Sequence, residues 1–213
     1  MSAKIFKEAI EAILKGDTGR ATDIAKQGLD EGLNPLELMD KGFIPGINQV
    51  GDQFEAGRLF LPQLVYSANA MEKATEIINA AIPAEQATVA GKVIVGTVEG
   101  DVHDIGKTIV VALFKANGFD VVDIGRDAPI DRFINEAEKM GAQIIGSSTL
   151  LTTTMVVQKQ LEQELIQAGL RAKYKTIVGG APVTQRWADR IGADAYAQDA
   201  GDGVKKVKQL LAG

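Results

Sequence analysis

Two hydrophobic periodicities divide the chain into an N-terminal and a C-terminal half. Up to about residue 82, apolar residues recur at the three- and four-residue spacing of amphipathic helices, whereas from Gly91 onward short β-branched runs alternate with helical segments. The stretch Pro83–Ala90 follows neither pattern, which is typical of a linker. We therefore predict a helical cap domain with its linker at 1–88 and an α/β domain at 89–213.

Four amphipathic helices are predicted in the N-terminal half. The first ends at Gly16, and Asp17 caps the second. Pro45 lacks an amide N–H and should kink or break the third helix, so that Asn34–Glu55 forms two pieces. A long last helix, Phe60–Ala81, completes a small all-α four-helix bundle.

Strands and helices alternate throughout the C-terminal half. The predicted strands are Lys92–Val98, Asp120–Ile124, Gln143–Ser147, Thr176–Val178 and Ala193–Ala197. The predicted helices are Ile105–Asn117, Ile130–Met140, Thr153–Ala168, Val183–Ile191 and Gly203–Leu211. Five such βα units predict a doubly wound, Rossmann- or flavodoxin-like five-stranded parallel sheet with helices on both faces. Ligands bind such sheets in the crevice beyond the carboxyl ends of the strands.

Composition narrows the classes of partner and of chemistry. The net charge is −5, the pI is near 5.0, and no basic stripe is present, which disfavours nucleic acid and anionic membranes as partners. The chain has no cysteine, which excludes disulfides and thiolate chemistry and fits a reducing compartment. The N-terminus lacks the features of a signal peptide, and no apolar run is long enough to span a bilayer. These features predict a cytoplasmic protein.

The single histidine of the chain, His103, follows the first strand of the α/β half. Asp101 stands two residues before it and can accept a hydrogen bond from one imidazole nitrogen, which leaves the other nitrogen free to bind a metal. A lone histidine is more often structural or exposed, and one histidine cannot build a zinc site without several carboxylates. A metal already held by a macrocycle needs only one protein ligand, which points to a haem or a corrin.

Two other interpretations of the same loop are weaker. Gly100–Thr108 follows a strand and opens a helix like a phosphate-binding loop, but its two glycines enclose five residues where that loop has four. Two acids and a histidine also occupy positions that should be free of negative charge near phosphate. An acidic pocket like that of receiver domains is comparably weak; it would use Asp101, Asp104 and Asp127.

Two further clusters of glycines and hydroxyls follow other strands on the same predicted edge. Gly146–Thr154 is by default a polar loop with a helix N-cap, and Gly179–Pro182 is by default a tight turn. Paired glycines also allow a ligand to approach the backbone closely. Together with the histidine loop, the two clusters outline a long cleft that suits a large ligand with amides and a nucleotide tail.

These separated motifs carry a family resemblance. Asp101-x-His103-x-x-Gly106, Ser148-x-Leu150 and Gly179-Gly180 together resemble the base-off/His-on cobalamin-binding signature. The stretch Val50–Met71 resembles the helical cap that precedes the cobalamin domain in cobalamin-dependent methionine synthase and in the small corrinoid proteins of methanol, methylamine and methoxy-compound methyltransferase systems. The resemblance covers nearly the whole chain and implies cobalamin or a related corrinoid as cofactor.

The resemblance also implies roles for individual residues. His103 would be the lower axial ligand of the corrin cobalt, Asp101 would hold its distal nitrogen, and Thr154 would stand where the family's relay has a serine. Phe54 and Leu61, which by spacing alone would be bundle core, would form a lid over the methyl-bearing face. The full set of implied cofactor-binding residues is Asp101, Val102, His103, Asp104, Ile105, Gly106, Ser148, Leu150, Thr152, Gly179, Gly180, Ala181, Asp199, Ala200, Phe54 and Leu61.

The resemblance implies a methyl carrier. Such a protein cycles between Co(I) and methyl-Co(III) and shuttles a methyl group from a substrate-specific methyltransferase to an acceptor methyltransferase of tetrahydrofolate or coenzyme M type, with a reductive activating protein as a further partner. It would be a non-catalytic or co-catalytic subunit, and Pro83–Ala90 would be the hinge on which the cap swings aside. A cobalamin-dependent sensor has the same two modules and remains the alternative; a free-standing mutase subunit is a third.

Overall fold

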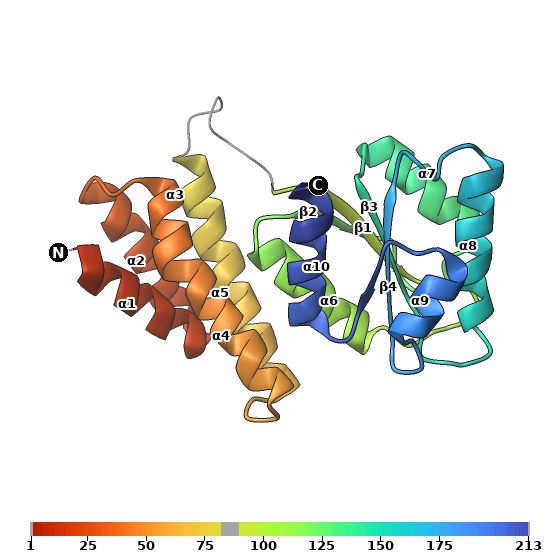
Figure 1. Ribbon diagram of the computed structural model, residues 1–213. Helices are drawn as coiled ribbons and strands as arrows, with labels where there is room; N and C mark the ends of the chain where they lie inside the picture. Colours follow the sequence, from red (N-terminus) through yellow and green to blue (C-terminus); the bar gives the residue numbers. More distant parts are fainter. Residues whose placement is uncertain (1, 82–89, 213) are drawn as a thin grey trace. The chain divides into compact units, whose positions relative to one another are not determined.

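The structure is a computed structural model that describes residues 2–81 and 90–212 (Figure 1). The chain divides into two compact units, a helical unit and an α/β unit built on a sheet, and each is described by itself. The predicted linker lies outside the described residues except for Ala90. No helix in these two ranges is long and apolar enough to cross a membrane.

The helical unit is a bundle, as predicted from its periodicity. Its elements are α1 (Ser2–Leu14), α2 (Thr18–Asp30), α3 (Pro35–Leu38), the π-helix η1 (Met39–Phe43), α4 (Ile44–Glu55) and α5 (Leu61–Ala80). The predicted cap of α2 is confirmed, because the Asp17 carboxylate accepts a hydrogen bond from the Arg20 N–H at 2.9 Å. The apolar faces of the helices meet in a core that includes Ile13, Ile24, Phe43, Ile47 and Leu64.

A π-helical turn lets the third predicted helix pass Pro45. Proline has no amide N–H and would leave an α-helix one hydrogen bond short. The turn η1 widens so that the Ile44 N–H bonds to the Met39 carbonyl, five residues back. Pro45 then falls in the first turn of α4, where the missing N–H of proline leaves no helical hydrogen bond unmade. The predicted interruption of Asn34–Glu55 is therefore a widened turn inside a continuous run of helix.

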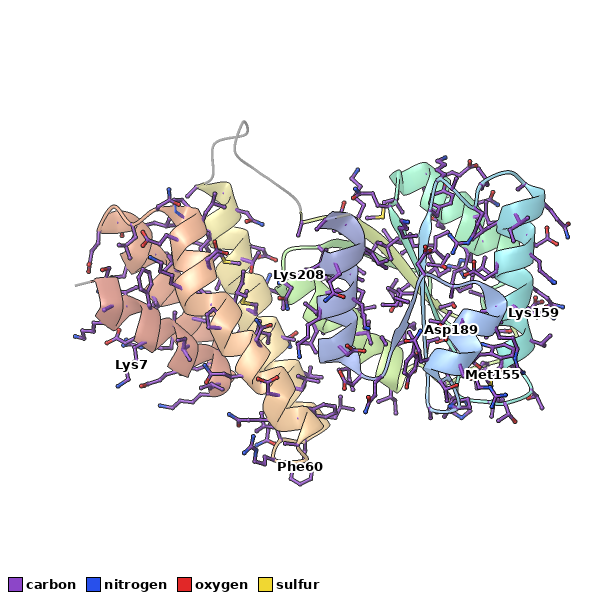
Figure 2. All side chains as sticks on the ribbon, in the orientation of Figure 1. Lys7, Phe60, Met155, Lys159, Asp189 and Lys208 are labelled. Atoms are coloured by element: carbon purple, nitrogen blue, oxygen red, sulfur yellow. The ribbon has the colours of Figure 1, made fainter. Side chains whose placement is uncertain are left out.

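The turn between α4 and α5 carries an exposed aromatic side chain. Phe60 is 72% exposed and projects from the end of this turn (Figure 2). Phe54 and Leu61, the predicted lid residues, lie on either side of the turn and are both half-buried. This end of the helical unit thus gathers apolar side chains that its own core does not fully cover.

The α/β unit contains the predicted five-stranded parallel sheet. Its strands are β1 (Lys92–Thr97), β2 (Asp120–Asp123), β3 (Ile144–Ser148), β4 (Lys175–Gly179) and β5 (Ala195–Ala197). Its helices are α6 (Ile105–Ala116), α7 (Ile130–Met140), α8 (Met155–Gln167), α9 (Gln185–Ile191) and α10 (Ala200–Ala212). The strand order is β2-β1-β3-β4-β5, and all neighbouring strands pair in parallel. The predicted fold class is confirmed.

The strand order reverses direction between β1 and β3. The chain steps outward from β1 to β2, then returns past β1 to β3, so right-handed crossovers place α6 and α7 on opposite faces of the sheet (Figure 1). On one face, Ile94, Phe133 and Leu161 belong to a core cluster between the sheet and the helices α7 and α8. Thr97 and Ser148 pair at the carboxyl ends of β1 and β3. The crevice of this fold therefore opens beside these two residues.

A cluster of charged side chains lies at the opposite, amino edge of the sheet. Arg171 donates from Nη2 to the Asp194 carboxylate at 2.8 Å, and its Nε lies 2.7 Å from Oε2 of Glu162. Asp194 also accepts a hydrogen bond from the Thr176 N–H at 2.8 Å. Glu162 is only 2% exposed, and this burial raises the pKa of its carboxyl, although Thr176 and Arg171 act in the opposite direction.

We expect Glu162→Gln to remove the decrease in the free energy of unfolding that ionisation of this buried carboxyl causes as pH rises. Because the folded pKa lies above the ordinary value of 4.5, the folded state binds the proton more tightly, and the free energy of unfolding falls as pH rises from that value through the raised pKa. The stability of the wild type relative to the variant should therefore decline over this range. Urea denaturation at a series of pH values measures the decline. A stability difference between the wild type and Glu162→Gln that stays constant with pH would refute the expectation.

Candidate functional site

His103 lies in the loop between β1 and α6, at the crevice where the strand order reverses. Its ring Nδ1 lies 2.8 Å from Oδ1 of Asp101, and its backbone N–H donates to the same oxygen at 3.0 Å. Thr97, buried at the end of β1, donates from Oγ1 to the carbonyl of His103 at 3.0 Å. The imidazole is 48% exposed. Since Nδ1 is engaged, Nε2 is the nitrogen available to a metal.

Asp101 ties the histidine loop to the loop between β3 and α8. Its side chain is fully buried, and its Oδ2 accepts hydrogen bonds from the backbone N–H groups of Leu150 at 2.6 Å and Leu151 at 3.2 Å. Burial alone would raise the pKa of this carboxyl, but the N–H groups of His103 and Leu150, the His103 ring and Leu151 together hold the pKa well below its usual range. Asp101 is therefore a carboxylate at physiological pH and a constant acceptor for His103.

Two threonine hydroxyls complete the surroundings of Asp101. Thr149 Oγ1 lies 3.0 Å and Thr154 Oγ1 lies 3.2 Å from Oδ2 of Asp101. Thr154 occupies the N-cap position of α8, the default role for a hydroxyl at such a place, yet its side chain makes no capping hydrogen bond there. The structure thus brings the predicted residues Asp101, His103, Leu150 and Thr154 into one hydrogen-bond network.

The glycine pair after β4 lies against the backbone of Thr149. Gly180 has φ +124°, and a Cβ atom at this position would stand 1.7 Å from the Thr149 carbonyl oxygen. The Thr149 N–H in turn donates to the Gly179 carbonyl at 3.2 Å. The sequence suggested that these glycines allow a ligand to approach the backbone. In the structure, position 180 requires glycine because the backbone of Thr149 lies against it. The loops after β3 and β4 are therefore held together.

The remaining predicted cofactor-binding residues are distributed over the same loops. Val102, Ile105 and Leu150 are apolar and 58%, 66% and 44% exposed; the first two are close to His103 in the chain, and the Leu150 N–H donates to Asp101. Asp199 Oδ1 accepts the Asp202 N–H at 2.7 Å and so caps the start of α10, which contains Ala200. The others lie at strand ends, in loops or at the start of α6; they are Asp104, Gly106, Ser148, Thr152, Gly179 and Ala181. Phe54 and Leu61 belong to the helical unit.

The phosphate-loop and acidic-pocket interpretations find no support in the side-chain contacts. The ammonium of Lys107 is buried and paired with the Asp123 carboxylate. Asp127 accepts a hydrogen bond from the Gly100 N–H at 2.7 Å. Within residues 2–81 and 90–212, no group of three or more His, Cys, Asp or Glu side chains is placed to hold a metal ion.

Sequence reasoning missed two residues of the network, Thr97 and Thr149. The signature counts only Ser148 and Leu150 in its second element and passes over the residue between them. The available signal was the run of hydroxyls that ends the buried strand β3, because hydroxyls inside an apolar strand end need hydrogen-bond partners. Thr97 carries the same signal at the end of β1.

Comparison with protein families agrees with this geometry. A family model described as the B12 binding domain matches residues 91–207. The chain belongs to this B12-binding family. A second model with the same description matches residues 5–79 of this B12-binding protein. The predicted resemblance and the predicted cofactor class, a cobalamin or related corrinoid, are confirmed.

Individual relatives of the B12-binding protein cover nearly all of it. Trimethylamine corrinoid protein 1 of Methanosarcina mazei is 47% identical over 210 residues, which are 98% of this chain and 97% of the relative. Dimethylamine corrinoid protein 1 of the same organism is 45% identical over 209 residues, 98% of this chain and 95% of the relative. A chain of the methanol:cobalamin methyltransferase complex MtaBC from Methanosarcina barkeri superimposes with a TM-score of 0.84 at 30% identity, covering 100% of this chain and 81% of that one.

The donor set fits a corrinoid. Its cobalt already has four equatorial nitrogen ligands, so one imidazole nitrogen from the protein is sufficient below the ring. His103 presents Nε2 on an exposed ring whose other nitrogen is held by a buried carboxylate. Exposed apolar side chains in the same loops suit the face of a flat macrocycle.

Proposed function

We propose that this B12-binding protein holds its corrinoid base-off with His103 as the lower axial ligand of cobalt, and that it carries a methyl group between two partner enzymes. The observation that carries the proposal is the 2.8 Å contact between His103 Nδ1 and the buried Asp101 carboxylate, which leaves Nε2 of a 48% exposed imidazole available to a metal. The bound corrinoid would supply a cobalt able to accept and release a methyl group.

The protein's own residues bind and orient the cofactor. His103 ligates through Nε2, and Asp101 keeps the proton on Nδ1, because an ionised carboxylate there favours that tautomer. Val102, Ile105 and Leu150 would contact the corrinoid through their exposed apolar side chains. In the proposed cap domain, residues 1–88, Phe54 and Leu61 would shield the methyl group from water.

The names of the relatives support methyltransferases as partners. The relatives are called trimethylamine and dimethylamine corrinoid proteins, and the structural neighbour comes from a methanol:cobalamin methyltransferase complex. The proposed donor partner is therefore a substrate-specific methyltransferase that acts on a small methylated compound such as a methylamine. The proposed acceptor partner is a methyltransferase of tetrahydrofolate or coenzyme M type, and a reductive activating protein restores Co(I).

We expect His103→Ala to abolish imidazole ligation of the cobalt. Because the chain has one histidine, growth on [¹⁵N]histidine labels only this side chain. In protein reconstituted with cobalamin and reduced to Co(II), the electron paramagnetic resonance signal of the wild type should change its nitrogen splitting on labelling. The variant should show the signal of cobalt without an imidazole ligand.

The exposed Gln160→Ala on α8 serves as the control and should keep the wild-type signal. An unchanged signal in His103→Ala would refute the ligand assignment.

For the carrier role, the reduced protein should accept a methyl group in the presence of a partner methyltransferase. If it accepts none and instead changes its oligomeric state with light or ligand, the sensor alternative is correct.

A further inference from the structure

We propose that Thr149 supplies the hydroxyl that donates to the Asp101 carboxylate, and that Thr149 is thereby a positioning residue for His103. The family's relay places this role at the position of Thr154. The proposal rests on the proposed function of His103 as the cobalt ligand, but it is argued from hydrogen bonds that exist without the cofactor.

Two hydroxyls compete for two acceptors in this part of the site. Thr149 Oγ1 lies 3.0 Å from Asp101 Oδ2 and 3.2 Å from the Leu151 carbonyl oxygen. Thr154 Oγ1 has the reverse preference, at 3.2 Å from Asp101 Oδ2 and 3.0 Å from the Leu151 carbonyl. The two hydroxyl oxygens are 2.5 Å apart. Each hydroxyl has one proton to donate. The shorter contact with Asp101 assigns the Thr149 proton to the carboxylate, which leaves the Thr154 proton for the Thr149 oxygen or the Leu151 carbonyl.

The number of donors around Asp101 Oδ2 supports the same assignment. A carboxylate offers about four lone-pair sites over its two oxygens. The backbone and ring N–H groups of His103 fill Oδ1. On Oδ2 the two shortest contacts are those with the Leu150 N–H at 2.6 Å and the Thr149 hydroxyl at 3.0 Å, and these two donors take its remaining sites; the Leu151 N–H lies at 3.2 Å. Thr154, also at 3.2 Å, would be a fourth donor on one oxygen, whereas the Thr149 oxygen and the Leu151 carbonyl give it other acceptors.

The backbone of Thr149 is held by two contacts with the end of β4 and the loop that follows it. Its N–H donates to the Gly179 carbonyl at the end of β4, and its carbonyl lies where a Cβ at position 180 would stand. Thr149 is 1% exposed, compared with 8% for Thr154. The hydroxyl that meets Asp101 is thus held by the central strands β3 and β4. Through Asp101, this support reaches the ring of His103.

The test compares Thr149→Val with Thr154→Val, which each replace a hydroxyl by a methyl group of similar size. In the full chain without cofactor, nitrogen NMR of the single labelled histidine reports which ring nitrogen carries the proton. Thr149→Val should shift the ring signals and lower the population protonated on Nδ1, while Thr154→Val should shift them less. With cobalamin bound as Co(II), Thr149→Val should weaken the binding of the imidazole to cobalt by about tenfold, the lower end of the loss seen when residues that support a metal ligand are replaced.

Thr149→Ser keeps the hydroxyl and should restore the wild-type ring signals. If either valine variant fails to fold, Thr149→Ala and Thr154→Ala make the same comparison with a smaller side chain. Ring signals that change as much or more in the Thr154 variant would overturn the proposal, as would wild-type signals in Thr149→Val. The cofactor-free NMR separates this proposal from the proposed function. Unchanged His103 ring signals in Thr149→Val would contradict the role of Thr149. A wild-type Co(II) signal that does not change on labelling with [¹⁵N]histidine would contradict ligation by His103.

Discussion

Replacement of Gly180 by alanine should lower the free energy of unfolding of the α/β unit by about 3 kcal/mol or more. The new methyl group would stand 1.7 Å from the Thr149 carbonyl oxygen and 2.9 Å from the Thr149 nitrogen, so the loops after β3 and β4 must separate. The φ of +124° is itself unfavourable for alanine. Fluorescence of the single tryptophan, Trp187 in α9, reports unfolding of this unit in urea.

Gly192→Ala is the matched control for Gly180→Ala. Gly192 ends α9 in the left-handed conformation with φ +83°, but a Cβ there meets no atom within 4 Å. This variant should lose only about 1–2 kcal/mol, the cost of a left-handed alanine. Equal losses in the two variants would show that the contact with Thr149 contributes nothing. Gly180→Ala should also shift the ring signals of His103, because it displaces the backbone of Thr149.

Asp101→Asn should destabilise the same unit by about 3 kcal/mol or more, since each buried donor left unpaired costs about 1–3 kcal/mol. The asparagine amide has nearly the shape of the carboxylate, but one of its two oxygens becomes an NH₂ group. If that group faces His103, it meets two N–H donors; if it faces Leu150 and Leu151, it meets two others. Neither orientation satisfies the network, and the His103 ring loses its fixed tautomer.

The change of charge alone is controlled by Asp120→Asn, which alters an exposed carboxylate at the start of β2. This variant should unfold within about 0.5 kcal/mol of the wild type, as surface substitutions usually do. Trp187 fluorescence in urea compares the two variants. An Asp101→Asn protein as stable as Asp120→Asn would contradict the hydrogen-bond network described for Asp101.

Local signals predicted the elements of the fold well. The helix Ile130–Met140 has the bounds expected from sequence, because Pro129 precedes it and Gly141 ends it in the left-handed conformation. The last helix begins earlier than expected, at Ala200, because Asp199 caps it, and the glycines in its first turn concealed that start. Helix α8 begins later than expected, at Met155, since the preceding hydroxyls turn toward Asp101.

In the site, residues in contact within one loop could be predicted from the sequence, whereas contacts between loops could not. The pair of Asp101 and His103 could be predicted because a spacing of two residues brings the carboxylate to the ring within one loop. Thr149 could not, because its contact with Asp101 depends on the register of β1 against β3 and on the conformation of the loop after β3. The clash that requires glycine at position 180 is a contact between loops, which no local pattern contains.

The charged cluster around Arg171 lies at the far end of β4 from the cofactor loops. Thr176 near the start of this strand contacts Asp194, whereas Gly179 at its end contacts Thr149. The strand Lys175–Gly179 is roughly 13 Å long at about 3.3 Å per residue, and this length separates the charged cluster from the loops after β3 and β4. Substitutions more than about 7–10 Å apart that share no partner usually change the free energy of unfolding additively. Charges around Arg171 can therefore be exchanged to alter the stability of the α/β unit while the hydrogen bonds of Asp101 stay in place.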